Sequence, residues 1–275
     1  MSETTSTRPP ATARSRTLLV SFLGAVVRPM GDWMPIAGAV ELLGRSGLDA
    51  ASVRTAVFRL KKRGWLESES RSGQRGYALT PAALEALAAG DEVIWHARQP
   101  ADLGDGWCLV NFSVPESARA VRHQLTAHLS SLGFGNIGSA VWIAPARMLP
   151  AARRAIAELD LTEQCAVFVG DYVGGQQLTT TVRNGWDLGE IDRRYREFIT
   201  EYSDVPTTGL DDADAFTTYL AVIDHWRKLP FRDPGLPLEV LTEDWTGPTA
   251  VHLFEHLVAT LEPPALTHAA TSWPA

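Results

Sequence analysis

Apolar residues recur at helical spacing through the N-terminal part of the chain and then give way to two short alternating segments. Residues 15–27, 34–43 and 50–63 each place apolar side chains on one face, which predicts three short amphipathic helices. Asp49 is suited to cap the third helix, and Gly64 is suited to end it. The segments WLESES and YALT flank a basic, glycine-containing turn and predict a β-hairpin. The predicted inward-facing residues are Leu18, Leu19, Phe22, Leu23, Val26, Ile36, Val40, Leu43, Val53, Val57 and Leu60.

The middle of the chain alternates between strand and helix patterns. The run WCLVNFS at 107–113 reads as a buried strand, and an amphipathic helix follows it up to Leu132. The segments IGSAVWIA, LPAARRAIAELD and CAVFVG then predict a strand or hairpin, a helix and a strand. This order is typical of a ferredoxin-like domain.

The C-terminal part has only helical periodicity. Residues 186–202 and 212–229 predict two amphipathic helices, and a third is expected from Pro248 to Leu261. The sequence therefore predicts an α+β multidomain protein with an N-terminal helix-and-hairpin domain, a central ferredoxin-like α/β domain and a C-terminal helical domain. The expected boundaries are a disordered arm at 1–14, domains at 15–95, 105–178 and 183–265, and a tail at 266–275.

Composition limits the class of protein. The 275 residues are 45% hydrophobic and 21% charged, which is ordinary for a globular chain. No window is apolar enough for a membrane span or a secretory signal, so a cytoplasmic protein with no membrane partner is expected. The two cysteines, Cys108 and Cys165, lie within apolar runs and are expected in the core rather than in a disulfide or a zinc site. We expect no metal, no cofactor and no catalytic residues.

The distribution of charge is uneven although the net charge is only −7. Residues 14–90 contain 11 Lys or Arg and 6 Asp or Glu, whereas residues 91–275 contain 13 and 25. Such an asymmetry indicates that the N-terminal domain meets a polyanion.

Three helices followed by a basic-tipped hairpin are typical of a winged helix-turn-helix, in which the third helix enters the major groove of DNA. Arg54 and Thr55 lie on the first turns of this helix, where side chains reach base edges. A winged helix that binds another protein remains an alternative at this point. The predicted DNA-binding residues are Ser52, Arg54, Thr55, Arg59, Lys61, Lys62, Arg71 and Arg75.

Several motifs together resemble one family. The runs SVRTAVFRLKKRGWLESESRSGQRGYALT, WCLVNFSVPES, LGFGNIGSAVWIAP and HWRKLPFRDPGLP, followed by EDW, are similar to those of the PaaX-like regulators of phenylacetate degradation. The resemblance extends from about residue 16 to about residue 262. It implies a homodimeric cytoplasmic repressor that binds double-stranded operator DNA and loses affinity for it when an acyl-CoA binds, phenylacetyl-CoA in the archetype.

In this family the middle domain is similar to the small ferredoxin-like endonuclease of CRISPR adaptation. That group of enzymes carries a metal-binding aspartate at the end of its first strand, whereas the corresponding stretch here is NFSVPE. We therefore expect a dimerisation and coupling domain rather than a metal-dependent nuclease, which remains the enzymatic alternative.

An acyl-CoA requires cations for its phosphates and apolar walls for its acyl group. The C-terminal domain offers both, although the element from His225 to Arg232 could instead simply close the fold, with its charged groups paired with Asp192, Asp224 or Asp233. The predicted effector-binding residues are Trp186, Arg193, Arg194, His225, Trp226, Arg227, Lys228 and Arg232.

Two further motifs are weaker signals. The run GFGNIG has dinucleotide-binding spacing but follows a helix and precedes a strand, the reverse of the required context, so turn glycines are expected. The run HLFEH, with His252, Glu255 and His256, matches the inverted zinc-protease signature, but downstream only Glu262 could provide a carboxylate ligand. Exposed helix histidines are the preferred interpretation.

Overall fold

The structure is a computed structural model that describes residues 11–96, 99–206, 208–229 and 233–273. It contains helices and two antiparallel sheets, so the predicted mixed α+β class is confirmed. The chain forms two compact units. The first contains residues 1–90, 202–227 and 252–275, and the second contains residues 91–201 and 228–251.

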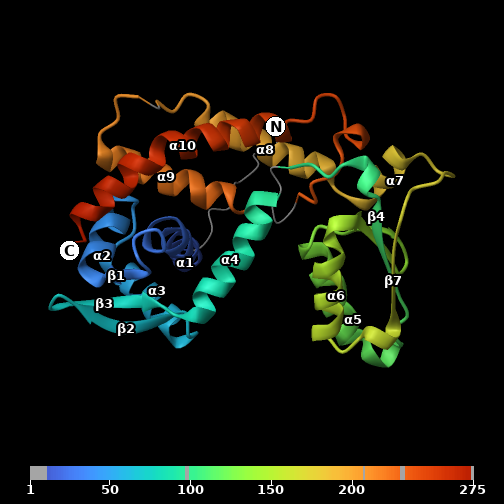
Figure 1. Ribbon diagram of the computed structural model, residues 1–275, viewed down its shortest axis with the longest axis horizontal. Helices are drawn as coiled ribbons and strands as arrows, with labels where there is room; N and C mark the ends of the chain where they lie inside the picture. The colour runs from blue at the N-terminus through green and yellow to red at the C-terminus, as the bar shows by residue number, and fades with distance from the viewer. Residues whose placement is uncertain (1–10, 97–98, 207, 230–232, 274–275) are drawn as a thin grey trace, which may run out of the picture. The chain divides into compact units, whose positions relative to one another are not determined.

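The first unit begins with three helices and a small antiparallel sheet of order β1-β3-β2 (Figure 1). The three predicted helices and the predicted hairpin are all present, and a three-residue strand, β1, adds to the hairpin. In chain order the elements are α1 (Ala11–Phe22), a π-helical turn (Leu23–Val27), β1 (Trp33–Pro35), α2 (Ile36–Arg45), α3 (Ala50–Lys62), β2 (Leu66–Arg71), β3 (Gln74–Leu79) and α4 (Pro81–His96).

The core of this unit follows the hydrophobic pattern closely. All predicted inward-facing residues of α1, of the turn after it and of α3 are buried. Helix α2 differs, because Ile36 and Val40 are only half-buried, whereas Ala39 and Leu42 lie in the core beside Leu43. The apolar face of α2 is thus rotated by about one residue from the predicted one.

Helix α9 (Asp212–Trp226) also belongs to the first unit and packs against α1. Arg227, directly after α9, donates to the carbonyl oxygen of Thr17 (2.9 Å) and to Oγ of Ser21 (2.6 Å). Ser21 Oγ in turn donates to Asp224 (2.7 Å). This partly buried network joins the two helices of the first unit. Residues 183–201 belong to the second unit, and the expected domain at 183–265 stays a prediction.

The C-terminal helix is longer than the sequence predicts. Helix α10 spans Gly247–Thr271, whereas an end at Leu261 and a tail at 266–275 were expected. Two adjacent prolines, Pro263 and Pro264, lie inside the helix, although proline ordinarily favours a stop. Burial of one helix face continues past the prolines, and such packing outweighs the lost backbone hydrogen bonds. Beyond the helix, buried Trp273 donates from Nε1 to the carbonyl oxygen of Trp33 (2.8 Å). The buried positions on this face include Leu257, Leu261, Ala265 and Ala269.

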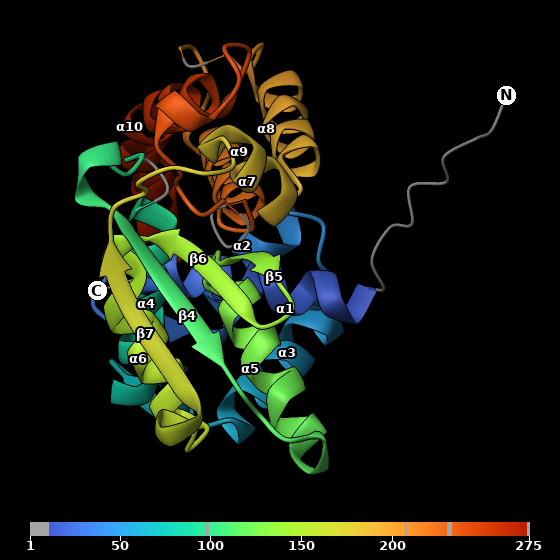
Figure 2. The ribbon, with the colours of Figure 1, turned by 90° about the vertical axis from the view of Figure 1, so that its right-hand side faces the viewer.

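The second unit contains a four-stranded antiparallel sheet of order β5-β6-β4-β7 (Figure 2). Its connectivity is strand, helix, two strands, helix, strand. A short helix, which the sequence pattern does not predict, and a longer one follow the sheet. The bounds are β4 (Trp107–Phe112), α5 (Arg119–Ser131), β5 (Gly135–Gly138), β6 (Val141–Pro145), α6 (Leu149–Glu158), β7 (Cys165–Gly170), α7 (Leu178–Gly185) and α8 (Leu188–Tyr202).

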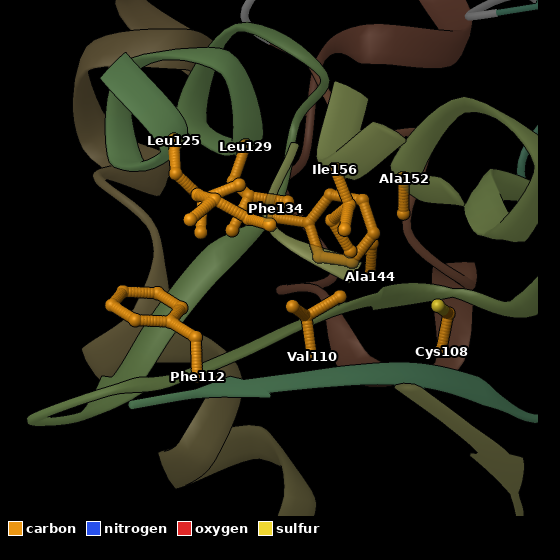
Figure 3. Packing of buried hydrophobic residues seen from close by; sticks show 10 residues of the cluster. Cys108, Val110, Phe112, Leu125, Leu129, Phe134, Ala144, Ala152 and Ile156 are labelled. Atoms are coloured by element: carbon orange, nitrogen blue, oxygen red, sulfur yellow. The ribbon is translucent and has the colours of Figure 1, made fainter. Parts of the chain in front are cut away.

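Helices α5 and α6 cover one face of this sheet (Figure 3). Side chains from alternate positions of β4, among them Val110 and Phe112, point toward Leu125, Leu129 and Ile156 on the helices. The opposite face packs against residues of α7 and of the segment after position 233. The sheet is therefore covered on both sides, although its edge strand β7 remains largely exposed.

Candidate nucleic-acid interface

Helix α3 is fixed at its N-terminus by its capping residue. Asp49 accepts hydrogen bonds from the backbone N–H of Ser52 (2.8 Å) and from its hydroxyl (2.6 Å). These bonds, the side-chain one most of all, lower the pKa of Asp49 from its ordinary value. The hydroxyl of Ser52, a predicted DNA-binding residue, is thus engaged in the cap.

The other predicted residues of α3 lie on its solvent side. Because Val53, Val57 and Leu60 turn into the core, Arg54 and Thr55 are exposed. Arg59, Lys61 and Lys62 are also exposed, and Lys61 Nζ donates to Ser68 Oγ on β2 (2.7 Å). The structure therefore brings five of the predicted residues onto one exposed helix surface.

The hairpin carries the remaining two predicted residues. Its tip is a two-residue turn in which Ser72 and Gly73 have φ values of 49° and 78°, as hairpin turns of this length require. Arg75 is exposed beside the tip. Arg71 instead folds back: it forms an ion pair with Glu69 (2.7 Å) and lies 5.4 Å above the Trp33 ring. Arg75 is the better placed of the two for a phosphate.

A groove of about 620 Å³ runs between α1 and α3. Four cations line it, and none of its described lining residues is acidic. Arg16 and Arg63 were not predicted for the interface. Arg63 lies four residues after Arg59, so helical spacing could have indicated it, whereas Arg16 comes from a different helix. The cations are Arg16, Arg59, Lys62 and Arg63.

Three predicted effector-binding residues of the second unit, Trp186, Arg193 and Arg194, form hydrogen bonds or ion pairs with other residues of that unit. The Trp186 ring covers Gly135, where a Cβ would lie 2.6 Å from the ring, and Nε1 donates to the carbonyl oxygen of Gly133 (2.8 Å). Gly133, with φ of +83°, forms the turn after α5, as expected for that position of the GFGNIG run, whereas Gly135 and Gly138 belong to strand β5. Trp186 therefore acts as a packing residue in this structure.

Arg193 and Arg194 on α8 both pair with Glu190, at 2.8 Å and 2.7 Å. Arg193 also pairs with Glu197. Lys228 lies exposed in the same unit, and the predicted residue Arg232 lies outside the described residues. These pairs with Glu190 were not predicted from the sequence, which named only Asp192, Asp224 and Asp233 as acidic partners.

In the first unit, helix α9 ends with His225 and Trp226, and Arg227 follows directly after it. Trp226 is fully buried and stacks on Phe254, with ring centroids 4.3 Å apart. His225 lies edge-on to Tyr202, and Arg227 pairs with Asp224 at 3.4 Å in addition to its bonds to α1. The eight predicted effector residues do not all fall within one unit, and their assignment stays a prediction.

The hydrogen bonds from Arg193 and Arg194 lower the pKa of Glu190 to about 2 from its ordinary value of 4.5. Since the folded-state pKa is the lower one, the stabilisation is present above pH 4.5 and is lost as the pH falls toward 2. We expect Glu190→Gln to lower the free energy of unfolding at pH 7 by less than about 1 kcal/mol, because the pairs are exposed, and to have a much smaller effect at pH 2. Urea titrations across this range measure it. Glu163→Gln is the control. A loss of stability in Glu190→Gln that does not change with pH would contradict the role of the Glu190 carboxylate.

The described residues contain no cluster of three or more His, Cys, Asp or Glu side chains that could hold a metal. On α10, His252 and His256 are exposed, and Glu262 accepts a hydrogen bond from the Tyr219 hydroxyl (3.0 Å). Both cysteines are free thiols, and burial raises the pKa of Cys108 to about 11. Among the described helices, none has the length and hydropathy that a membrane span requires.

Most of the chain matches the models of one protein family. The description "PaaX-like protein" matches residues 14–83, "PaaX protein central Cas2-like domain" matches 100–182, and "PaaX-like protein C-terminal domain" matches 186–271. The chain therefore belongs to the PaaX-like family, and the predicted membership is confirmed.

One relative carries a functional name. The transcriptional repressor PaaX of Escherichia coli (strain K12) is 28% identical over 260 residues, which cover 90% of this chain and 81% of that protein. Among solved structures, the uncharacterized protein Rv0674 from Mycobacterium tuberculosis has a TM-score of 0.63 at 18% identity. The match covers 96% of this chain and all of that chain. The first comparison agrees with the predicted class, a transcriptional repressor, and the second supports the fold alone.

Proposed function

We propose that this protein is a DNA-binding transcriptional repressor that acts in the cytoplasm and has no catalytic activity. The observation that carries the proposal is the surface of α3, on which Arg54, Thr55, Arg59, Lys61 and Lys62 are exposed together. Cations arranged in this way neutralise phosphates and, at the first turns of a helix, reach base edges. The relationship to a transcriptional repressor supports the same function.

The connectivity of the first unit supports its interpretation as a winged helix-turn-helix. Three helices precede a hairpin, and β1 pairs with β3 to complete a small sheet. Helix α3 enters the major groove, and the hairpin is the wing that contacts the adjacent backbone. Arg54 and Thr55 read bases, while Arg59, Lys61, Lys62 and Arg75 bind phosphates, with Arg16 and Arg63 added from the groove between α1 and α3.

The sheet of the second unit supports a ferredoxin-like domain. Numbered along the chain, its strands have the spatial order 2-3-1-4, all antiparallel, with both helices on one face, as expected for the split βαβ arrangement. We assign dimerisation to this domain, so that two winged helices of a homodimer read two half-sites of an operator.

An acyl-CoA thioester is the proposed effector. Its phosphates require cations such as Arg193, Arg194 and Lys228, and its binding releases the operator by favouring a dimer whose half-site spacing no longer matches. Since both α8 arginines are paired with Glu190, the effector has to compete with that carboxylate. Loss of DNA affinity then follows only if the two dimer states bind the effector unequally.

A mobility-shift experiment tests the function. Purified protein and the DNA upstream of its own gene are titrated at several salt concentrations, with excess nonspecific competitor. Five or six phosphate contacts per protomer predict a slope of log K against log salt of about −5 per protomer. Absence of specific binding at moderate salt contradicts the proposal.

The effector is tested in the same assay with a panel of aryl- and acyl-CoA thioesters, using free coenzyme A as the control. We expect one thioester to release the DNA. Binding that no thioester affects would retain the repressor and reject the acyl-CoA effector.

A further inference from the structure

Phe58 is the residue of α3 that the interface described above does not use. Its side chain is 55% exposed, on the helix face opposite the buried residues Val53 and Leu60. Among the described residues of the first unit, no other large hydrophobic side chain is exposed to this extent. Exposure of an aromatic ring to water is unfavourable in free energy, and this favours a role in which a binding partner covers the ring.

The surroundings of Phe58 indicate what covers it. The ammonium group of Lys62 lies 5.1 Å from the ring centroid, and Arg54 lies one helical turn earlier on the same side of the helix. Arg54 and Lys62, one helical turn before and after Phe58, favour a polyanion over an apolar protein surface, because burying these cations against such a surface would leave their charges unpaired.

We propose that Phe58 reads thymine by packing its ring against the C5-methyl group in the major groove. This inference rests on the proposed function, because it requires α3 to lie in that groove. The thymine methyl is the apolar feature of the major-groove edge, and apolar side chains recognise it there. Phe58 supplies the apolar contact, while Arg54 reads a guanine and Lys62 binds a phosphate.

The spacing of the two base-reading residues predicts a feature of the binding site. Arg54 and Phe58 are separated by four residues, or about 6 Å along the helix. Base pairs are stacked about 3.4 Å apart. The half-site therefore contains a guanine and a thymine within about two base pairs of each other.

The test begins with in vitro selection of duplex DNA from a random library by the full-length protein. Each thymine of the selected half-site is then replaced singly by deoxyuridine, which removes the methyl group and leaves the pairing intact. For the wild-type protein we expect one such replacement to lower affinity about fourfold, the value of one buried methylene-sized group. For Phe58→Ala we expect a similar loss on the thymine duplex and no further loss on the deoxyuridine duplex.

Two variants serve as controls for this double-mutant cycle. Phe168→Ala removes an equally exposed ring (60%) from β7 in the second unit and should discriminate thymine from deoxyuridine as the wild type does. Phe58→Leu keeps an apolar contact and should retain part of the discrimination. Circular dichroism tests whether each variant folds as the wild type does, and size-exclusion chromatography tests whether it has the same oligomeric state.

Three results overturn the inference. One is equal binding of thymine and deoxyuridine duplexes by the wild type at every position. Another is discrimination that persists unchanged in Phe58→Ala. The third is a change of oligomeric state in Phe58→Ala, which would place the ring in an interface between copies. Failure of the selection to enrich any sequence would instead contradict the proposed function itself.

Discussion

Arg54→Ala is expected to lower affinity for the selected duplex by about 10- to 100-fold, because a bidentate contact between arginine and guanine contributes about 1–3 kcal/mol. The side chain is exposed on the second turn of α3, so its removal leaves the core intact. Fluorescence anisotropy at fixed salt measures the loss. Replacement of the contacted guanine should weaken binding by the wild type and leave binding by the variant unchanged.

Arg153→Ala is the matched control for this prediction. It removes the same charge from an exposed position on α6 of the second unit and should change affinity by less than about twofold. Equal effects of the two substitutions would mean that only net charge matters. Unchanged affinity in Arg54→Ala would favour a winged helix that binds another protein.

Trp273→Ala is expected to lower the free energy of unfolding by about 3–5 kcal/mol, the usual cost of truncating a large buried aromatic side chain. The ring lies 5.9 Å from that of Phe22 of α1, and Nε1 donates to the carbonyl oxygen of Trp33 in β1. The substitution therefore removes contacts with both a helix and the sheet of the first unit. Chemical unfolding followed by circular dichroism measures the change.

Two further variants complete this test: the first separates packing from hydrogen bonding at position 273, and the second is a control at an exposed site. Trp273→Phe keeps most of the ring and loses the hydrogen bond to Trp33, so a smaller cost of about 1–2 kcal/mol is expected. Tyr172→Ala, an exposed aromatic residue of the second unit, should cost less than about 0.5 kcal/mol. A Trp273→Ala protein as stable as the wild type would show that residues beyond α10 add nothing to the core.

Local pattern predicted the elements well where a repeat was long enough to recognise. The third helix begins after Asp49 and its buried face is the predicted one, because both signals are local. Strand β1 has three residues, too few for alternation to indicate it. The extent of α10 and the sharing of the C-terminal helices between two units depend on packing partners that are distant in sequence.

The same distinction applies to the interface. The exposed cations of α3 follow from helical periodicity and were predicted, whereas the engagement of Ser52 by Asp49 and of Arg71 by Glu69 and Trp33 depends on neighbouring side chains. Arg16 joins the surface only through the packing of α1 on α3. Phe58 was assigned neither to the core nor to the interface, because the interface was predicted from polar and charged residues alone.

Residues 202–227 and 252–273 complete the first unit, so this unit cannot finish folding until late in translation. A ribosome that has completed the wing has still to add the C-terminal segments that pack against α1 and β1, which takes about 10–40 s at ordinary elongation rates. During this interval Phe22 and Trp33 lack their partners from the C-terminal part of the chain. The first unit therefore completes its core only after Trp273 has been synthesised, and a chain that ends before this residue cannot form the core in full.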